Sequence, residues 1–136
     1  MRKLKNRTAA VTGGGGCIGS EICRKLAEQG ANIAVIDIRR EVADATADSI
    51  RAAGGTAESF VADITDYAAV VKLMDSIEER FGSVDILVNV AGGSARAKCR
   101  EFKDQELEVM EDVLKMNVLS ALCCTRAVVN RMVEAK

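Results

Sequence analysis

Histidine is absent from all 136 residues of this sequence. Its absence excludes a histidine general base and zinc sites of the mixed Cys/His type. The cysteines, five in number, include no C-x-x-C spacing, so they predict neither a metal site nor a paired disulfide framework. We therefore expect no metal site, and we expect reduced thiols that are mostly buried.

Aromatic residues and surplus charge are also scarce. Aromatic side chains make up 3% of the sequence and apolar residues 49%, so the core must be aliphatic. The 19 lysines and arginines nearly cancel the 20 aspartates and glutamates. The net charge of −1 argues against nucleic acid and membrane surfaces as partners, because both require concentrated positive charge.

Proline and long hydrophobic runs are missing as well. The apolar stretch at residues 8–11, which follows a basic opening, is too short for the core of a signal peptide, and no later stretch approaches a membrane span. No linker or repeat divides the chain. We expect a cytoplasmic protein with one domain over residues 1–136, long enough to bury a core.

What the sequence does contain is an alternation of two kinds of segment. Runs rich in β-branched and aliphatic residues have the length of strands buried on both faces of a parallel sheet; they cover residues 8–12, 32–37, 56–62 and 84–89. Between them, apolar residues recur at helical spacing, and each stripe ends at glycine. These stripes are Ile18, Ile22 and Leu26; Val42, Ala45 and Ile50; and Val70, Leu73, Met74 and Ile77. A last pattern, from about residue 104 to 133, predicts one long helix.

Strand and helix thus alternate four times, and right-handed crossovers then give an α/β fold. We predict a Rossmann-type, doubly wound parallel sheet of four strands in the order 3-2-1-4, with helices on both faces. In this order the chain reverses direction between the first and fourth strands. Ligands bind at such a switch point, beyond the carboxyl ends of the strands.

A glycine-rich segment, residues 12–19 with the sequence TGGGGCIG, joins the first strand to the first helix, and Asp37 closes the next strand. This order of strand, glycine turn, helix and acidic residue is typical of dinucleotide-binding sites. There, main-chain N–H groups meet the pyrophosphate at the positive end of the helix dipole. The alternative is a tight strand-to-helix turn without a ligand.

Thr12, Gly13 and Gly19 are similar to the T-G-x-x-x-G-x-G pattern of the short-chain dehydrogenase/reductase family. Three further features match that family in order: the Asp63-Ile64 pair, the turn Asn89-Val90-Ala91-Gly92 and Asn117 in the last helix. The sequence therefore resembles the N-terminal, cofactor-binding half of a family member. The resemblance implies an oxidoreductase that transfers hydride between NAD(H) and an alcohol or carbonyl.

In that family, catalysis depends on a serine and a Tyr-x-x-x-Lys motif, which would lie beyond Lys136. Tyr67 is the only tyrosine here and is followed by Ala-Ala-Val-Val. The resemblance therefore predicts a chain truncated before its catalytic residues, so that a small alcohol or carbonyl substrate would need the missing half. Two alternatives stay open: a stand-alone NAD-binding module without catalysis, and a homo-oligomeric interaction module that kept the fold and lost the ligand.

The resemblance also implies which residues form the site. The cofactor-binding residues would be Gly13, Gly15, Gly16, Cys17, Ile18, Gly19, Asp37, Ile38, Asp63, Ile64, Asn89, Val90, Ala91 and Gly92. Asn117 would bend the last helix and take part in the catalytic proton relay. Asp37 would accept hydrogen bonds from the adenine-ribose hydroxyls and repel a 2′-phosphate, which favours NAD over NADP. Arg39 and Arg40 could counter that repulsion.

Two positions depart from the family pattern. Cys17 replaces the middle glycine, and Val90 replaces the second asparagine of an N-N-A-G turn. An inert small residue is the favoured interpretation of Cys17. The other hypothesis is that Cys17 is sensitive to an oxidation that blocks the cofactor, since a helix N-terminus favours a thiolate. Without a following strand, the fourth strand and the last helix would leave apolar surface uncovered. We therefore predict a homodimer or a higher oligomer.

Overall fold

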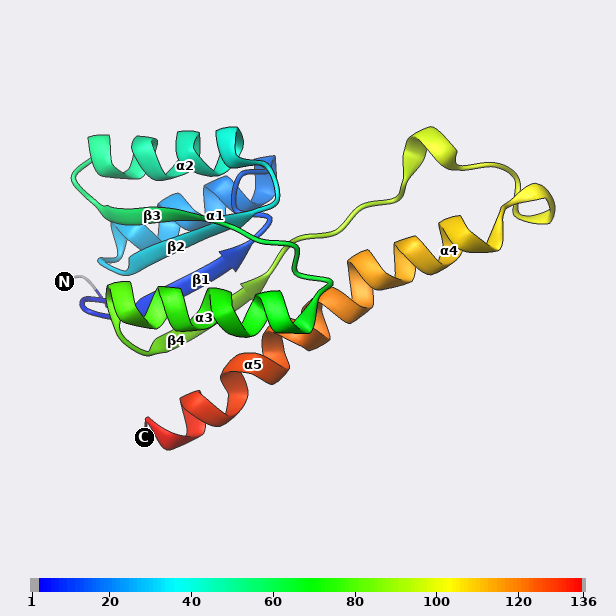
Figure 1. The fold of residues 1–136 in the computed structure, drawn as a ribbon. Helices are drawn as coiled ribbons and strands as arrows, with labels where there is room; N and C mark the ends of the chain where they lie inside the picture. The colour runs from blue at the N-terminus through cyan, green and yellow to red at the C-terminus, as the bar shows by residue number, and fades with distance from the viewer. Residues whose placement is uncertain (1–2, 136) are drawn as a thin grey trace.

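The structure is a computed structural model that describes residues 3–135. Within these residues, four parallel strands form a sheet in the order β3-β2-β1-β4 (Figure 1). The strands are β1 (Thr8–Thr12), β2 (Asn32–Asp37), β3 (Thr56–Val61) and β4 (Val84–Asn89). The predicted fold class and strand order are confirmed. Only the third strand differs in extent, because it ends one residue earlier than expected.

Helices cover both faces of this sheet (Figure 1). One face is covered by α1 (Cys17–Glu28) and α2 (Arg40–Ala52), and the other by α3 (Tyr67–Phe81) and α5 (Ser120–Glu134). The helix α4 (Leu107–Leu114) projects away from the sheet (Figure 1). Within the described chain, no helix is both long enough and apolar enough to cross a bilayer.

The core is divided into two layers by the alternation of side chains along the strands. Ala9 and Ile33 face α1 and α2, whereas Ala10 and Ile36 face α3 and α5. All five residues of β1 are buried, so the strand at the centre of the sheet is dry on both sides. Because β1 lies between β2 and β4, the turn that follows it is in the inner part of the sheet's carboxyl edge.

Two of the predicted helix stripes differ from the face that is buried. The helix α1 buries Gly19, Cys23 and Ala27, one residue after each stripe position, and leaves Ile22 and Leu26 partly buried. Ala45 is exposed, and α2 instead buries Ala43, Ala47 and Ile50, which follow the i, i+4, i+7 spacing of a core-facing helix. Ile18 is 70% exposed because it lies in the first turn of α1, beyond the carboxyl edge of the sheet. Its side chain is therefore available to the site described below.

The last helical pattern is not the single regular helix that its periodicity predicts. A π-helical turn at Lys115–Leu119 joins α4 to α5. In a π turn the backbone hydrogen bonds shift by one residue, and side chains bond to nearby carbonyls here. The Asn117 side-chain amide donates to the Val113 carbonyl at 2.8 Å, and the Ser120 hydroxyl donates to the Met116 carbonyl at 2.6 Å.

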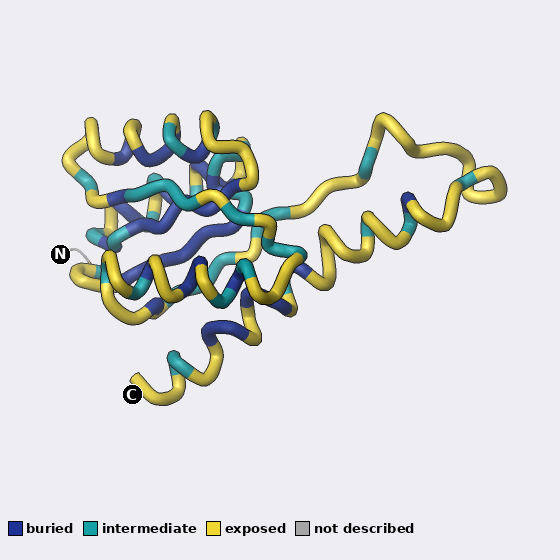
Figure 2. The backbone as a smooth tube through the Cα atoms, in the orientation of Figure 1, coloured by how far each residue is buried: buried dark blue, intermediate teal, exposed yellow. Residues whose placement is uncertain are grey.

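The helix α5 is fixed to α3 by Arg131. Its guanidinium donates to Asp75 and to Glu78, each at 2.8 Å. The hydrogen bond that Arg131 donates to the Asp75 carboxylate is the largest cause that raises the pKa of Arg131 above its ordinary value. By contrast, the opposite side of the α4–α5 region and the loop before it are mostly exposed (Figure 2). The strand β4 is an edge of the sheet, with Ile86 and Leu87 only partly buried.

Candidate functional site

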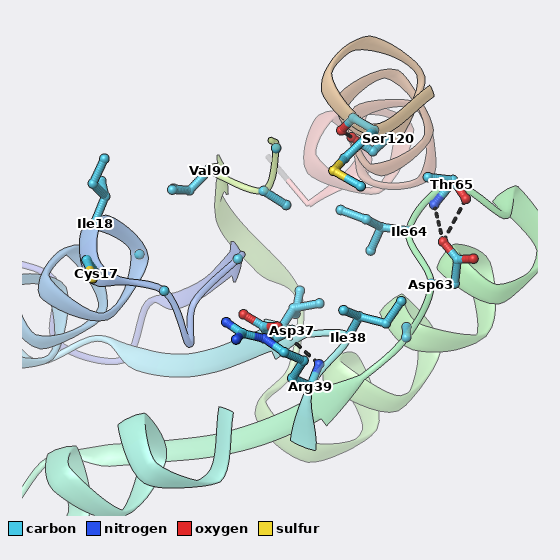
Figure 3. Close-up of a pocket in the computed structure, with 18 residues that line it drawn as sticks. Cys17, Ile18, Asp37, Ile38, Arg39, Asp63, Ile64, Thr65, Val90 and Ser120 are labelled. Atoms are coloured by element: carbon cyan, nitrogen blue, oxygen red, sulfur yellow. Dashed lines mark hydrogen bonds and ion pairs between the residues drawn. The ribbon is translucent and has the colours of Figure 1, made fainter. Parts of the chain in front are cut away.

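A cavity of about 450 Å³ opens at the carboxyl edge of the sheet (Figure 3). Its walls come from the turn after β1, the ends of β2 and β3, the turn after β4 and the π turn. Twelve of the predicted site residues line it: Gly13, Gly16, Cys17, Ile18, Gly19, Asp37, Ile38, Asp63, Ile64, Val90, Ala91 and Gly92. The other three, Gly15, Asn89 and Asn117, do not line it.

The glycine turn is packed too closely to carry side chains at two key positions. A Cβ at Gly19 would lie 2.1 Å from the Gly13 carbonyl oxygen, and Gly13 has a φ of +64°, in the left-handed region. A Cβ at Gly13 would also lie 2.9 Å from the backbone of Ala91. The glycines therefore let α1 begin directly against the turn, with its N-terminus at the cavity.

The first turn of α1 leaves its main-chain donors available. The Gly14 N–H donates to the Ile36 carbonyl of β2 at 2.9 Å, and the Gly16 N–H donates to the Gly13 carbonyl within the turn at 3.0 Å. Within residues 3–135, however, the N–H groups of Cys17, Ile18 and Gly19 have no backbone acceptor, and no side chain caps this helix. Uncapped donors at a helix N-terminus form a binding site for an anion when a cavity lies in front of them.

Asp37 links the end of β2 to the glycine turn. One carboxylate oxygen accepts a hydrogen bond from the Gly15 N–H at 3.1 Å, and the other accepts from the Arg39 N–H at 3.1 Å. Gly15 therefore acts through Asp37 and lies outside the cavity wall. The Asp37 side chain is 8% exposed and lines the cavity, where its remaining lone pairs can accept from a ligand (Figure 3).

Asp63 and Thr65 form the next part of the wall. The Asp63 carboxylate accepts from the Thr65 hydroxyl at 2.7 Å and from the Thr65 N–H at 2.9 Å (Figure 3). These hydrogen bonds, the side-chain one first, hold the pKa of Asp63 below its usual range. Asp63 therefore carries a negative charge at the cavity rim, next to the apolar side chain of Ile64.

The turn after β4 is tied to the glycine turn by Thr12. The buried Thr12 hydroxyl accepts hydrogen bonds from the N–H groups of Val90 and Ala91, at 3.2 and 3.3 Å. Asn89, in contrast, is exposed, and its side chain donates to the Thr125 hydroxyl at 3.3 Å, away from the cavity wall. In this structure, the backbone of the turn rather than the Asn89 side chain faces the cavity.

The short chain dehydrogenase family model matches residues 7–136. This chain belongs to that family. It is 37% identical over 134 residues to a short chain dehydrogenase of Pseudocercospora fijiensis, with 98% of this chain and 43% of the relative covered. It is 36% identical to the 2,3-dihydro-2,3-dihydroxybenzoate dehydrogenase of Bacillus subtilis over 118 residues, which cover 87% of this chain and 45% of that protein.

The fold of the family is shown by solved structures. An NAD⁺-bound xylitol dehydrogenase superposes with a TM-score of 0.92 at 34% identity, covering 98% of this chain and 50% of that one. The chain spans about half the length of the curated relatives it matches. The predicted resemblance to the cofactor-binding half of a short-chain dehydrogenase is confirmed.

Cys17 is the departure from the short-chain dehydrogenase pattern that bears most directly on the site. It is the first residue of α1, is exposed, and forms part of the cavity wall. The cavity is present with the thiol in place, so the side chain does not fill it. The sensitivity of Cys17 to oxidation stays a prediction.

Asn117 lies behind the cavity and holds the chain that leaves it. Its side-chain amide donates to the Gly93 carbonyl at 2.7 Å, and its carbonyl oxygen accepts from the Gly93 N–H at 3.1 Å. A Cβ at Gly92 would lie 2.5 Å from that oxygen. Asn117 thus positions the turn and sits in the π turn, and its part in a proton relay stays a prediction.

Several wall residues were not among the predicted site residues. They are Ile36, Arg39, Ala62, Thr65, Met116 and Ser120. Most of them are neighbours in sequence of predicted residues, so a wider window around each motif would have found them. Ser120 is different, because it lies three residues beyond Asn117, where α5 begins directly after the π turn.

Proposed function

We propose that the chain is the cofactor-binding part of a short-chain oxidoreductase and that it binds NAD(H) in this cavity. The observation that carries the proposal is the row of unpartnered N–H groups at Cys17, Ile18 and Gly19, directed from a helix N-terminus into a cavity. The likeness to an NAD⁺-bound xylitol dehydrogenase supports it.

Each wall has the chemistry that one part of a dinucleotide requires. The α1 N-terminus would hold the diphosphate, and the Asp37 carboxylate would accept the adenine-ribose hydroxyls. Asp63 and Ile64 would hold the adenine ring, while the backbone from Val90 would meet the nicotinamide-side ribose. The negative charge of Asp37 favours NAD over NADP, although Arg39 lies 3.8 Å from that carboxylate.

The bound cofactor would supply hydride transfer to or from an alcohol or carbonyl. In this proposal the described residues bind and orient the cofactor. They do not include the Tyr-x-x-x-Lys motif, because the only tyrosine, Tyr67, begins α3 and is not followed by lysine four residues later. We propose the oxidoreductase activity for the protein in which a tyrosine and a lysine complete this site. A cytoplasmic location is part of the proposal, since all five cysteines are free and suit a reducing compartment.

Calorimetric titration of the chain with NAD and with NADP tests this function. We expect NAD to bind with a dissociation constant below about 1 mM and more tightly than NADP. Binding of neither cofactor at millimolar concentration would contradict the proposal. Tighter binding of NADP would contradict the part assigned to Asp37 and leave the site itself in place.

We also propose that the chain forms a homodimer or a higher oligomer. Leu114, Leu122 and Val133 are 61, 60 and 64% exposed along the α4–α5 region, and β4 is a sheet edge. Apolar ridges and unpaired strand edges both promote association. Sedimentation velocity is expected to show a dimer that Leu122→Glu weakens, whereas a monomer at high concentration would contradict it.

A further inference from the structure

The segment that leaves the cavity after the β4 turn projects away from the body of the molecule before it reaches α4 (Figure 1). We call residues 93–106 the basic arm. It begins at Gly93, which the Asn117 side chain grips by two hydrogen bonds. The residue before it, Gly92, lines the cavity together with Met116. The arm therefore starts at the end of the cavity assigned above to the nicotinamide side.

Three cations of the basic arm lack a counterion. Arg96, Lys98 and Arg100 are exposed, and within residues 3–135 no carboxylate lies within 4.0 Å of their charged groups. Lys103, a few residues later, is paired with Glu101 at 3.2 Å. The arm also carries three carboxylates, Glu101, Asp104 and Glu106, but all of them come after Arg100 in the sequence. The three cations alternate along the first half of the arm with no carboxylate between them, and like charges this close in sequence repel each other. An anion placed among them would remove the repulsion.

The arm is a folded element rather than an open connection. The Gln105 side chain accepts from the Arg100 N–H at 2.8 Å and donates to the Lys98 carbonyl at 3.3 Å. Ala95 has a φ of +49°, in the left-handed region that disfavours alanine. Such a conformation persists only where surrounding contacts impose it, and it is found preferentially at binding sites. The backbone that carries the three cations is thus held in one shape.

We propose that the basic arm binds an anionic group of the substrate, a carboxylate or a phosphate, at the end remote from the reacting carbon. The assignment rests on the proposed function, because that function places the reacting carbon near the start of the arm. Arg96, Lys98 and Arg100 follow the cavity residue Gly92 in chain order, so a substrate that extends from the cavity along the arm would reach them. Guanidinium groups bind carboxylates and phosphates through paired hydrogen bonds, which gives them selectivity for these anions.

The test uses the full chain saturated with NAD, so that the diphosphate site is blocked. The NAD-loaded, ¹⁵N-labelled protein is titrated with glutarate, with pyrophosphate and with neutral 1,5-pentanediol, and amide shifts are followed. The triple variant Arg96→Gln, Lys98→Gln, Arg100→Gln is compared with Lys72→Gln, which removes an exposed cation of α3. Shifts caused by NAD at residues 13–19 report the proposed function separately.

We expect saturable shifts in the basic arm with one of the two anions and none with the diol. The dissociation constant should rise at least about fivefold in the triple variant and stay unchanged in Lys72→Gln. A preference for glutarate or for pyrophosphate identifies the anion as carboxylate or phosphate. If the triple variant bound the anion as tightly as the original protein, or if the anion-induced shifts were spread equally over other cations, the assignment would be overturned. Unchanged NAD-induced shifts at residues 13–19 would then still support the proposed function. Loss of self-association in the triple variant without a change in anion binding would also overturn it.

Discussion

Replacing Gly19 by alanine tests the central packing contact of the site. The new Cβ would lie 2.1 Å from the Gly13 carbonyl oxygen and 2.7 Å from the Gly13 carbonyl carbon. Both are backbone atoms, so the separation can reach an ordinary contact distance only if α1 moves away from the turn. Overpacking of this kind costs up to about 3 kcal/mol. Alanine recovers about 1 kcal/mol, because it favours a helix more than glycine does.

The net loss of unfolding free energy is therefore about 2 kcal/mol, which lowers the melting temperature by roughly 6–8 °C for a domain of this size. Cofactor affinity should fall by more than tenfold, because the same movement displaces the amides of Cys17 and Ile18. Thermal unfolding followed by circular dichroism measures the first effect, and calorimetric titration with NAD measures the second.

Gly16→Ala is the matched control. Its Cβ would meet only the Gly13 carbonyl oxygen at 3.4 Å, an ordinary contact, and Gly16 has a φ of −79° that alanine readily adopts. We expect its melting temperature to stay within about 2 °C of the original protein. If Gly19→Ala melted within 1 °C of Gly16→Ala and bound NAD equally well, the close approach of α1 to the turn would be refuted.

Three further predictions concern other parts of the site. Asp37→Asn should lower the unfolding free energy by about 1–2 kcal/mol, because one of the two N–H donors to this side chain loses its acceptor, and thermal melts measure this loss. It should also weaken NAD binding more than NADP binding, because the carboxylate assigned to the ribose hydroxyls is removed, and calorimetry measures both affinities. Asn117→Ala should release the start of the basic arm and speed its cleavage by trypsin several-fold, and equal cleavage of both proteins would contradict this. At pH 8.5, iodoacetamide should alkylate Cys17 and Cys99 but spare Cys23, whose pKa burial raises to about 12, and bound NAD should slow Cys17 alone; mass spectrometry of the labelled peptides decides it.

The raised pKa of the Cys23 thiol also sets a direction for stability at high pH. The folded pKa of about 12 lies above the ordinary value of 9.0, so the stabilising contribution is fully present below about pH 9 and is lost as the pH rises toward 12. We expect the melting temperature to fall over that range and to fall less in Cys23→Ala. Parallel slopes for the two proteins would contradict this origin of the alkaline instability.

The sequence was most informative where local chemistry alone determines the structure. Strand order follows from the alternation of segments, and the place of the glycine turn and Asp37 follows from the end of each strand. Contacts between distant parts of the chain could not be predicted in this way. The π turn depends on Asn117 and on Gly93, 24 residues earlier, whereas the apolar periodicity runs through it without a break.

The phase error at Ala45 has a different cause. Alanine is common on both faces of a helix, so the apolar pattern of α2 fitted two registers, and burial selected Ala43 and Ala47. The Asn89 side chain donates to the Thr125 hydroxyl, 36 residues later in α5, a contact that no local pattern indicates. The shape of the basic arm depends on the side-chain bonds of Gln105, which no local sequence pattern indicates.

The Thr12 hydroxyl has a consequence for how small a working piece of this fold can be. It joins two chain segments that are 78 residues apart in sequence into one continuous floor. A polypeptide cut between β3 and β4 would retain every glycine of the first turn and yet have only half of a binding surface. The shortest stretch able to hold a whole dinucleotide must therefore extend through the residues that follow β4.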